Sequence, residues 1–315
     1  MSAHTVRTIG IVLAAGMVVA VLGIRFALGR MLSTGGPSQD AIQKKVQSKD
    51  GTVIAYEKTG AGPAVVLVSA ALADRDGARR LARELAPTFT VINYDRRGRG
   101  KSSNTEPYAV EREIEDLEAL VDAVGQPVFV FGSSSGAVLA LDAGTRFGAR
   151  VKKLFLYEPP FIVDASHAPI PDSLQKEIED AVAANKRGEA VALFFGKGMG
   201  IPAPGVTFMR LMLPAWRDMT AIVHTAPYDL KILAGTQSGR PLPPDRWSRG
   251  TSPTMVAVGA KSEAFFHNGA EALTGMLPGS EYRSLEGLDH SAVLMAPQAL
   301  ASAIREYFAS GGNPI

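Results

Sequence analysis

The chain of 315 residues contains no cysteine. This absence excludes disulfide bonds, thiolate zinc sites and lipid attachment through cysteine, and it leaves the redox compartment open. The chain also lacks an excess of charge, because 33 lysines and arginines are balanced by 31 aspartates and glutamates. Without a strong net field or a basic stripe interleaved with aromatic residues, we expect no nucleic-acid partner. The five histidines are not clustered with acidic residues at the spacing of metal ligands, so we expect no metal ion and no other cofactor.

A long apolar run stands near the N-terminus. Residues 8–24 are uncharged, and apolar residues continue past Arg25 to Leu32. This length fits a tilted transmembrane helix better than the core of a signal peptide, and no good small-x-small cleavage site follows. We therefore predict a membrane anchor over residues 1–32, with a cleaved export signal as the alternative, and a tether over residues 33–46. We expect the soluble domain on the extracytoplasmic side, as is usual for signal anchors, although the count of basic residues favours the cytoplasmic side.

From residue 47 onward, short apolar runs alternate with amphipathic segments, in a chain that is 46% hydrophobic. Such alternation predicts a mostly parallel sheet covered by helices on both faces. No convincing strand appears in residues 159–252, where helical patterns predict a cap inserted into a core of residues 47–158 and 253–315. The expected strands are 52–58, 64–68, 89–94, 128–131, 151–157, 254–258 and 281–285, and the expected helices are 76–85, 107–124, one beginning near 137, 172–186, 216–223, 264–276 and 297–308.

The run Gly-Ser-Ser-Ser-Gly at residues 132–136 would be a flexible linker in a polar setting. Here an apolar strand precedes it and an apolar helix follows, so we expect a strand-to-helix turn. The pattern G-x-S-x-G at such a turn permits a sharp bend that lifts the central hydroxyl clear of the sheet. Ser134 is therefore a candidate nucleophile, and it needs a base to accept its proton.

Two further motifs accompany this turn. The segment YDRRGRGKS covers residues 94–102 after one expected strand, and LEGLDH covers residues 285–290 after the last strand. With these motifs, residues from about 47 to 310 resemble the α/β-hydrolase fold family in its serine-nucleophile branch. The resemblance implies the chain order Ser, acid, His, with His290 as the general base. Dehalogenases and epoxide hydrolases of this fold attack with aspartate, so Ser134 favours acyl transfer to water.

The acid departs from the commonest pattern of the family. The usual aspartate would stand three residues beyond Gly259, and this chain has Ser262 there. Glu263 is one candidate, although an acidic residue at the start of a helix is also favoured by the helix dipole. Glu158 is the other, because it directly follows the preceding core strand, where some relatives, including a branch of the haloalkane dehalogenases, carry their acid. We favour Glu158 and keep Glu263 as the alternative.

The expected oxyanion hole also departs from the family. A developing oxyanion needs backbone N–H groups from the residue after the nucleophile, here Ser135, and from the loop after an early strand. That loop usually begins His-Gly, whereas residues 69–72 read Ser-Ala-Ala-Leu. Ala71 can still supply its N–H, since backbone donors survive side-chain changes. Six residues are candidates for the substrate pocket: Leu72, Phe194, Met212, Trp216, His224 and Tyr228.

These residues favour a serine hydrolase of esterase type, which cleaves an apolar carboxylic ester, lactone or related carbonyl substrate through an acyl-serine intermediate. The alternative is a non-catalytic protein on the same fold that binds or senses a small molecule, because both the His-Gly pair and the usual acid are missing. The oligomeric state stays open.

Overall fold

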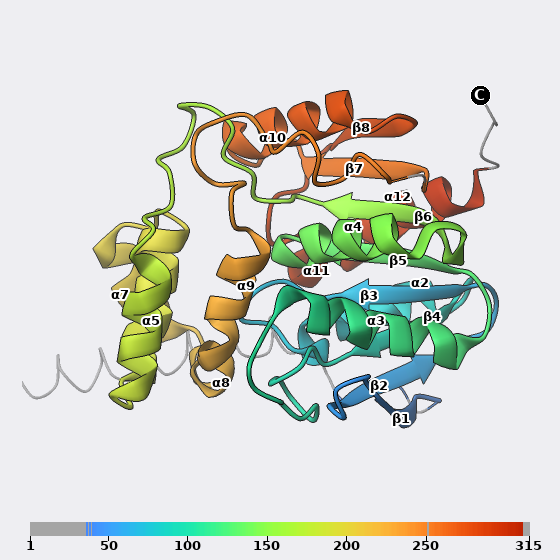
Figure 1. The fold of residues 1–315 in the computed structure, drawn as a ribbon, viewed down its shortest axis with the longest axis horizontal. Helices are drawn as coiled ribbons and strands as arrows, with labels where there is room; N and C mark the ends of the chain where they lie inside the picture. Colours follow the sequence, from blue (N-terminus) through green and yellow to red (C-terminus); the bar gives the residue numbers. More distant parts are fainter. Residues whose placement is uncertain (1–35, 37, 39, 251, 311–315) are drawn as a thin grey trace, which may run out of the picture.

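The computed structural model describes residues 36, 38, 40–250 and 252–310. Their centre is an eight-stranded sheet with the strand order β1-β2-β4-β3-β5-β6-β7-β8 (Figure 1). Strand β2 runs antiparallel to its neighbours β1 and β4, and the other neighbouring strands are parallel. The strands are β1 (Ile42–Gln47), β2 (Val53–Thr59), β3 (Ala64–Val68), β4 (Thr90–Tyr94), β5 (Val128–Ser133), β6 (Val151–Tyr157), β7 (Thr254–Gly259) and β8 (Ser280–Leu285).

Helices cover both faces of this sheet, and each face has its own apolar core. In Figure 1, α3 and α4 lie in front of the strands and α12 lies behind them. Every residue of β3 and β5 is buried, as expected for parallel strands covered on both sides. One face carries α3 (Val110–Val124), α4 (Ser135–Phe147) and α10 (Ala264–Met276), and the other carries α2 (Arg79–Leu85), α11 (Ala292–Met295) and α12 (Pro297–Ala309).

A group of helices lies between β6 and β7 in the chain and beyond one end of the sheet (Figure 1). These cap helices share a separate apolar cluster that includes Leu174, Val191 and Trp216. The last of them, α9 (Ala226–Ile232), contacts α4 of the core. The others are α5 (Leu174–Ala183), α6 (Arg187–Leu193), a π-helical turn (Phe194–Gly198), α7 (Ala203–Met212), α8 (Trp216–Ile222) and a 3-10 turn (Val223–Thr225).

The predicted strands and helices are present. Three of them, β3, β6 and α10, have the predicted limits, and the ends of the others are shifted by a few residues. The predicted tether is wrong at its end, because Ile42–Gln47 forms β1 and pairs with β2. This strand is mostly exposed, so its sequence IQKKVQ lacks the apolar run by which the other strands were predicted. The described residues include no helix that is long and apolar enough to cross a membrane. The predicted anchor, residues 1–32, lies outside the described residues.

Candidate active site

Ser134 stands at the sharp turn between β5 and α4. Its backbone has φ 54° and ψ −127°, a conformation that residues other than glycine rarely adopt. A hydrogen bond of 2.9 Å from its N–H to Tyr157 O holds this conformation. The flanking glycines are required, because a Cβ on Gly132 would lie 2.4 Å from Gly136 O and one on Gly136 would lie 2.5 Å from Ser69 O. Ser134 is partly exposed although both of its neighbours are buried.

A cavity of about 450 Å³ opens beside Ser134, between the sheet and the cap. Ser134 and His290 both line it, and within the described residues the Ser134 hydroxyl has no hydrogen-bond partner. The rest of the wall is mostly apolar and comes from core and cap alike, as shown by Leu72, Phe131, Phe194, Phe195, Met219 and Leu230. The cavity can therefore receive an apolar group beside a hydroxyl and an imidazole.

His290 is held from behind by Glu158. The distance between His290 Nδ1 and Glu158 Oε2 is 2.7 Å, and the imidazole stacks on the Phe266 ring with 4.7 Å between centroids. An acceptor at Nδ1 keeps a proton there in the neutral ring and leaves Nε2 free to accept another. The imidazole is thus oriented as a base facing the cavity.

Glu158 itself is completely buried and lies directly after β6. Its φ is 51°, so the chain turns sharply there and sends the side chain away from the strand. Its second oxygen, Oε1, accepts hydrogen bonds from Gly259 N at 2.7 Å and from Ser262 Oγ at 2.5 Å. Ser262 occupies the position of the family's usual aspartate and donates to the glutamate that reaches His290.

Glu263, the other candidate acid, has a different environment. It is exposed at the start of α10 and on the wall of the cavity. Its carboxylate makes no hydrogen bond or ion pair with any other described residue. The structure therefore brings Glu158 to His290 and does not bring Glu263 there.

The two expected oxyanion donors lie on the same cavity wall. Ser135 is the first residue of α4, and its N–H has no partner within that helix, as holds for the first four N–H groups of any helix. Ala71 lies in the loop after β3, where the next residue, Leu72, has φ 54°. The loop carbonyls accept from arginines: Arg99 Nη1 lies 2.7 Å from Ala70 O and 3.0 Å from Ala73 O.

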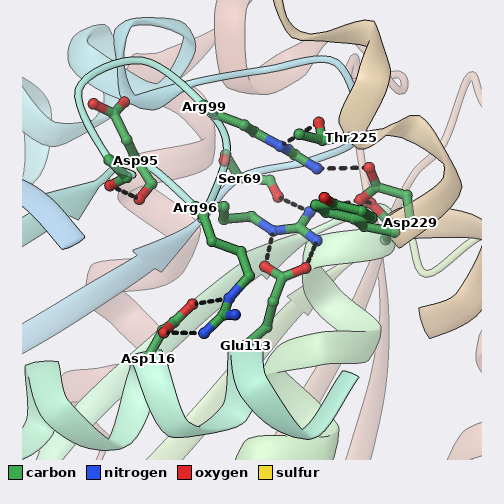
Figure 2. Close-up of polar contacts among 12 residues, drawn as sticks. Ser69, Asp95, Arg96, Arg99, Glu113, Asp116, Thr225 and Asp229 are labelled. Atoms are coloured by element: carbon green, nitrogen blue, oxygen red, sulfur yellow. Dashed lines mark hydrogen bonds and ion pairs between the residues drawn. The ribbon is translucent and has the colours of Figure 1, made fainter. Parts of the chain in front are cut away.

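Sequence reasoning missed the polar cluster behind this loop, which consists of Arg96, Arg99, Glu113 and Asp229 (Figure 2). Arg96 binds Glu113 through two hydrogen bonds of 2.7 and 2.8 Å and binds Asp229 at 2.6 Å. Arg99 binds the other oxygen of Asp229, also at 2.6 Å. Asp229 Oδ1 in addition accepts from Ser135 Oγ at 2.7 Å. The only sequence signal was the arginine-rich segment DRRGRG, from which the family motif uses Arg97.

Burial alone would raise the pKa of Asp229, but the guanidinium groups of Arg96 and Arg99 outweigh it and hold the pKa below its usual range. Burial would lower the pKa of Arg96, and the carboxylates of Asp229 and Glu113 raise it well above its usual value instead. These shifts favour the ionised form of Asp229 and the protonated form of Arg96. The pKa of Arg99 moves the other way, because burial and the neighbouring Arg96 lower it more than Asp229 and Glu113 raise it.

The predicted pocket residues divide into two sets. Leu72 and Phe194 line the cavity, whereas the other four do not. Met212 and Trp216 are buried in the cap, and Trp216 stacks with Phe195, 6.2 Å between centroids. Apolar spacing on a helix shows that a face is buried but not what covers it. His224 contacts Arg187, and Tyr228 stacks on Tyr108 with 3.7 Å between centroids and donates to Glu106. No group of three or more His, Asp and Glu among the described residues could hold a metal ion.

Comparison with known proteins defines the class. A model of the alpha/beta hydrolase family matches residues 65–303, and the chain therefore belongs to that family. The chain is similar to an alpha/beta hydrolase of known structure from Sphaerobacter thermophilus DSM 20745, with 44% identity and a TM-score of 0.78. That comparison covers 84% of this chain and 100% of the other. The expectation of an α/β-hydrolase fold is confirmed.

Two other matches have lower sequence identity and support less about this chain. An uncharacterized hydrolase of Bacillus subtilis (strain 168), YraK, is 34% identical over 147 residues, which are 45% of this chain and 54% of YraK. The match thus spans about half of that protein. An esterase from Exiguobacterium antarcticum has 20% identity and a TM-score of 0.65, over 85% of this chain and 100% of its own, and shows the fold alone.

Proposed function

We propose that the protein is a serine hydrolase that cleaves a carboxylic ester, lactone or related carbonyl compound through an acyl-serine intermediate. The observation that carries this proposal is the 2.7 Å contact between the buried Glu158 carboxylate and His290, on a cavity that His290 shares with Ser134. A serine attacks a carbonyl carbon near neutral pH when an imidazole accepts its proton and a carboxylate orients that imidazole.

In the proposed reaction, His290 Nε2 takes the proton of Ser134 Oγ while that oxygen attacks the carbonyl carbon. Glu158 holds the Nδ1 proton and stabilises the imidazolium that forms. The N–H groups of Ser135 and Ala71 donate to the oxyanion of the tetrahedral intermediate. The imidazolium then protonates the leaving alcohol, and water, deprotonated by the same imidazole, releases the acid from Ser134.

Glu158 acts as the acid in this scheme, and Glu263 does not. Glu158 has the contact to His290, and the donors Gly259 N and Ser262 Oγ fix its other oxygen. Glu263 lies at the cavity wall with neither feature. A carboxylate without a contact to the imidazole can neither orient it nor select its tautomer.

The substrate is proposed to be a small molecule with an apolar acyl chain or ring. A volume of about 450 Å³ falls in the range of small-molecule sites, and the wall is mostly aliphatic and aromatic. Apolar surface removed from water there contributes roughly 25 cal/mol per Å² to binding. The apolar run over residues 8–24 supports the further proposal of a membrane anchor, which would place such a site near lipid.

The test is labelling with a fluorophosphonate, which reacts with activated serines, in the full-length protein. We expect one label, and peptide mapping must place it on Ser134 rather than on Ser133 or Ser135. The Ser134→Ala variant should take up no label. A folded wild-type protein without label would contradict the hydrolase and would favour a non-catalytic protein that binds a small molecule.

A second arm connects labelling to turnover. The wild type and Ser134→Ala are assayed with esters of one alcohol whose acyl chains increase in length. We expect Ser134→Ala to lose about 10⁶ of kcat. A preference for polar or charged acyl groups would contradict the proposed substrate class while leaving the hydrolase intact.

A further inference from the structure

The loop that supplies the second oxyanion donor lacks the glycine of its family. Residues 69–73 read Ser-Ala-Ala-Leu-Ala. Ala70 stands where the family has glycine and is not among the residues with positive φ, whereas Leu72 has φ 54° without the freedom of glycine. Such a loop needs other contacts to keep its shape. These contacts come from side chains: Arg96 Nη1 donates to Ser69 O at 3.3 Å, and Arg99 Nη1 donates to Ala70 O and Ala73 O at 2.7 and 3.0 Å.

The bond to Ala70 O bears directly on the oxyanion donor. The carbonyl of Ala70 and the N–H of Ala71 belong to one planar trans peptide group, so they point in opposite directions. A guanidinium that fixes the carbonyl therefore also fixes the direction of the N–H. A charge-assisted bond to the carbonyl polarises the peptide as well and makes its N–H a stronger donor.

Arg99 is in turn held by the cap. Its Nε donates to Thr225 Oγ1 at 3.0 Å, and its Nη2 donates to Asp229 Oδ2 at 2.6 Å (Figure 2). The other oxygen of Asp229 accepts from Arg96 and from Ser135 Oγ. Ser135 carries the first oxyanion donor. One carboxylate on helix α9 is thus connected to both donor groups, by one bond to Ser135 and through Arg99 to the Ala70–Ala71 peptide.

We propose that Arg99 and Asp229 are positioning residues for the oxyanion hole, and that they make its geometry depend on the placement of cap helix α9. Arg99 holds the loop from outside through its bonds to Ala70 O and Ala73 O. The proposal rests on the proposed function, because an oxyanion forms only if Ser134 attacks a carbonyl.

The test compares Arg99→Lys with Arg97→Lys in the full-length protein. Arg97 is a buried neighbour that binds Asp116 and Asp50, and among the described residues it makes no hydrogen bond to residues 69–73. Both variants lose buried charged hydrogen bonds, so both lose stability. We expect only Arg99→Lys to lower kcat, by about 10- to 100-fold with KM within about twofold, since the hole is misaligned rather than deleted.

A spectroscopic readout separates this role from a structural one. An alkyl trifluoromethyl ketone adds to Ser134 Oγ and forms a hemiketal whose oxygen lies in the oxyanion hole. Its fluorine NMR shift, followed against pH, gives the pKa of that hemiketal. We expect Arg99→Lys to raise this pKa by about one unit, which means that the oxyanion is stabilised about tenfold less. Arg97→Lys is expected to leave the pKa unchanged.

An unchanged kcat and hemiketal pKa in folded Arg99→Lys would overturn the proposal, and so would a loss confined to KM. Should Arg99→Lys fail to fold, Thr225→Val removes only the bond to Arg99 Nε and the bond to Ile222 O. It is expected to raise the hemiketal pKa by a smaller amount, and no rise would count against the proposal. A wild-type protein that forms no adduct would overturn the proposed function and this inference together.

Discussion

Two polar centres lie beside the cavity, and they differ in whether their charges can change. In the first, Glu158 is buried, but the His290 side chain is 32% exposed and faces the cavity. In the second, the side chains of Arg96, Arg99, Glu113 and Asp229 are at most 2% exposed. A proton can reach the first centre, whereas the second is closed to solvent.

The difference teaches how the work of the site is divided in the proposed mechanism. A general base must gain and lose a proton in each cycle, so one of its faces has to stay open. An electrostatic scaffold must keep its geometry through the cycle, and here both carboxylates are buried and bonded to arginines. Removing one carboxylate from each centre tests this difference, and two further substitutions, at Ser262 and Asp50, sharpen it; the largest expected effect comes first.

Glu158→Gln is expected to lower kcat by about 10⁴ with little change in stability. The amide fills the same volume and still accepts from Gly259 and Ser262, but it donates to His290 Nδ1 and moves the ring proton to Nε2. Steady-state kinetics and chemical denaturation measure the two effects. If Glu263→Gln abolished turnover and Glu158→Gln spared it, the assignment of the acid would be wrong.

Asp229→Asn is expected to affect stability more than turnover. It should lower the free energy of unfolding by about 3–5 kcal/mol, because a buried charge is left without its partner. Its loss of kcat should stay far below that of Glu158→Gln. Denaturant titration of both variants makes the comparison. Equal stability of Asp229→Asn and Glu158→Gln would contradict the picture of a fixed scaffold.

Ser262→Asp, made in the Glu158→Gln background, is expected to recover about tenfold in kcat. Ser262 Oγ lies 2.5 Å from Glu158 Oε1, so a carboxylate at this position returns a negative charge close to His290. In the wild-type background, the same substitution should slow the enzyme, because two adjacent carboxylates repel each other and one takes up a proton. No recovery in the Glu158→Gln background would show that a carboxylate at residue 262 cannot replace the one at residue 158.

The smallest effect is expected from Asp50→Asn, which removes a partner of Arg97 in the arginine-rich loop. Burial would raise its pKa, but hydrogen bonds from Arg97 and Thr52 outweigh it and lower the pKa to about 2. Since this is below the value of about 3.9 in an unfolded chain, Asp50 stabilises the fold above about pH 4 and loses this effect as the pH falls towards 2. Asp50→Asn should therefore be less stable than the wild type at pH 7 and equally stable near pH 2. A difference that persists at the lower pH would point to packing instead of charge.

The sequence was sufficient wherever short-range patterns decide the structure. Strand β6 and helix α10 were predicted to the residue because periodicity and flanking residues define them. The motifs made Ser134 and His290 candidates because their letters reflect local geometry, such as the two glycines that a close backbone approach demands, and both residues line the cavity. For the acid, the sequence left two carboxylates open, because the contact between residues 158 and 290 crosses 132 positions.

It was insufficient where tertiary packing decides. Asp229 stands one residue from Tyr228, which was considered for the pocket, and no local pattern indicates that its carboxylate reaches Ser135, 94 positions away. Arg96 and Arg99 occupy variable places in the loop motif, so the motif assigned no role to them. In the cap, helical periodicity marked Trp216 as inward-facing, but inward there means the core of the cap, not the cavity.

Strand β1, which the sequence concealed, has a consequence for the protein in crowded solution. It forms one edge of the sheet, and the unpaired N–H and C=O groups of an edge invite strands from other molecules. Here the exposed edge carries Lys44 and Lys45, and the opposite edge, β8, carries Glu281 and Arg283. A second copy that paired with either edge would remove these charged side chains from water, which is unfavourable. The polar sequence that made β1 hard to predict therefore also opposes edge-to-edge assembly into fibres.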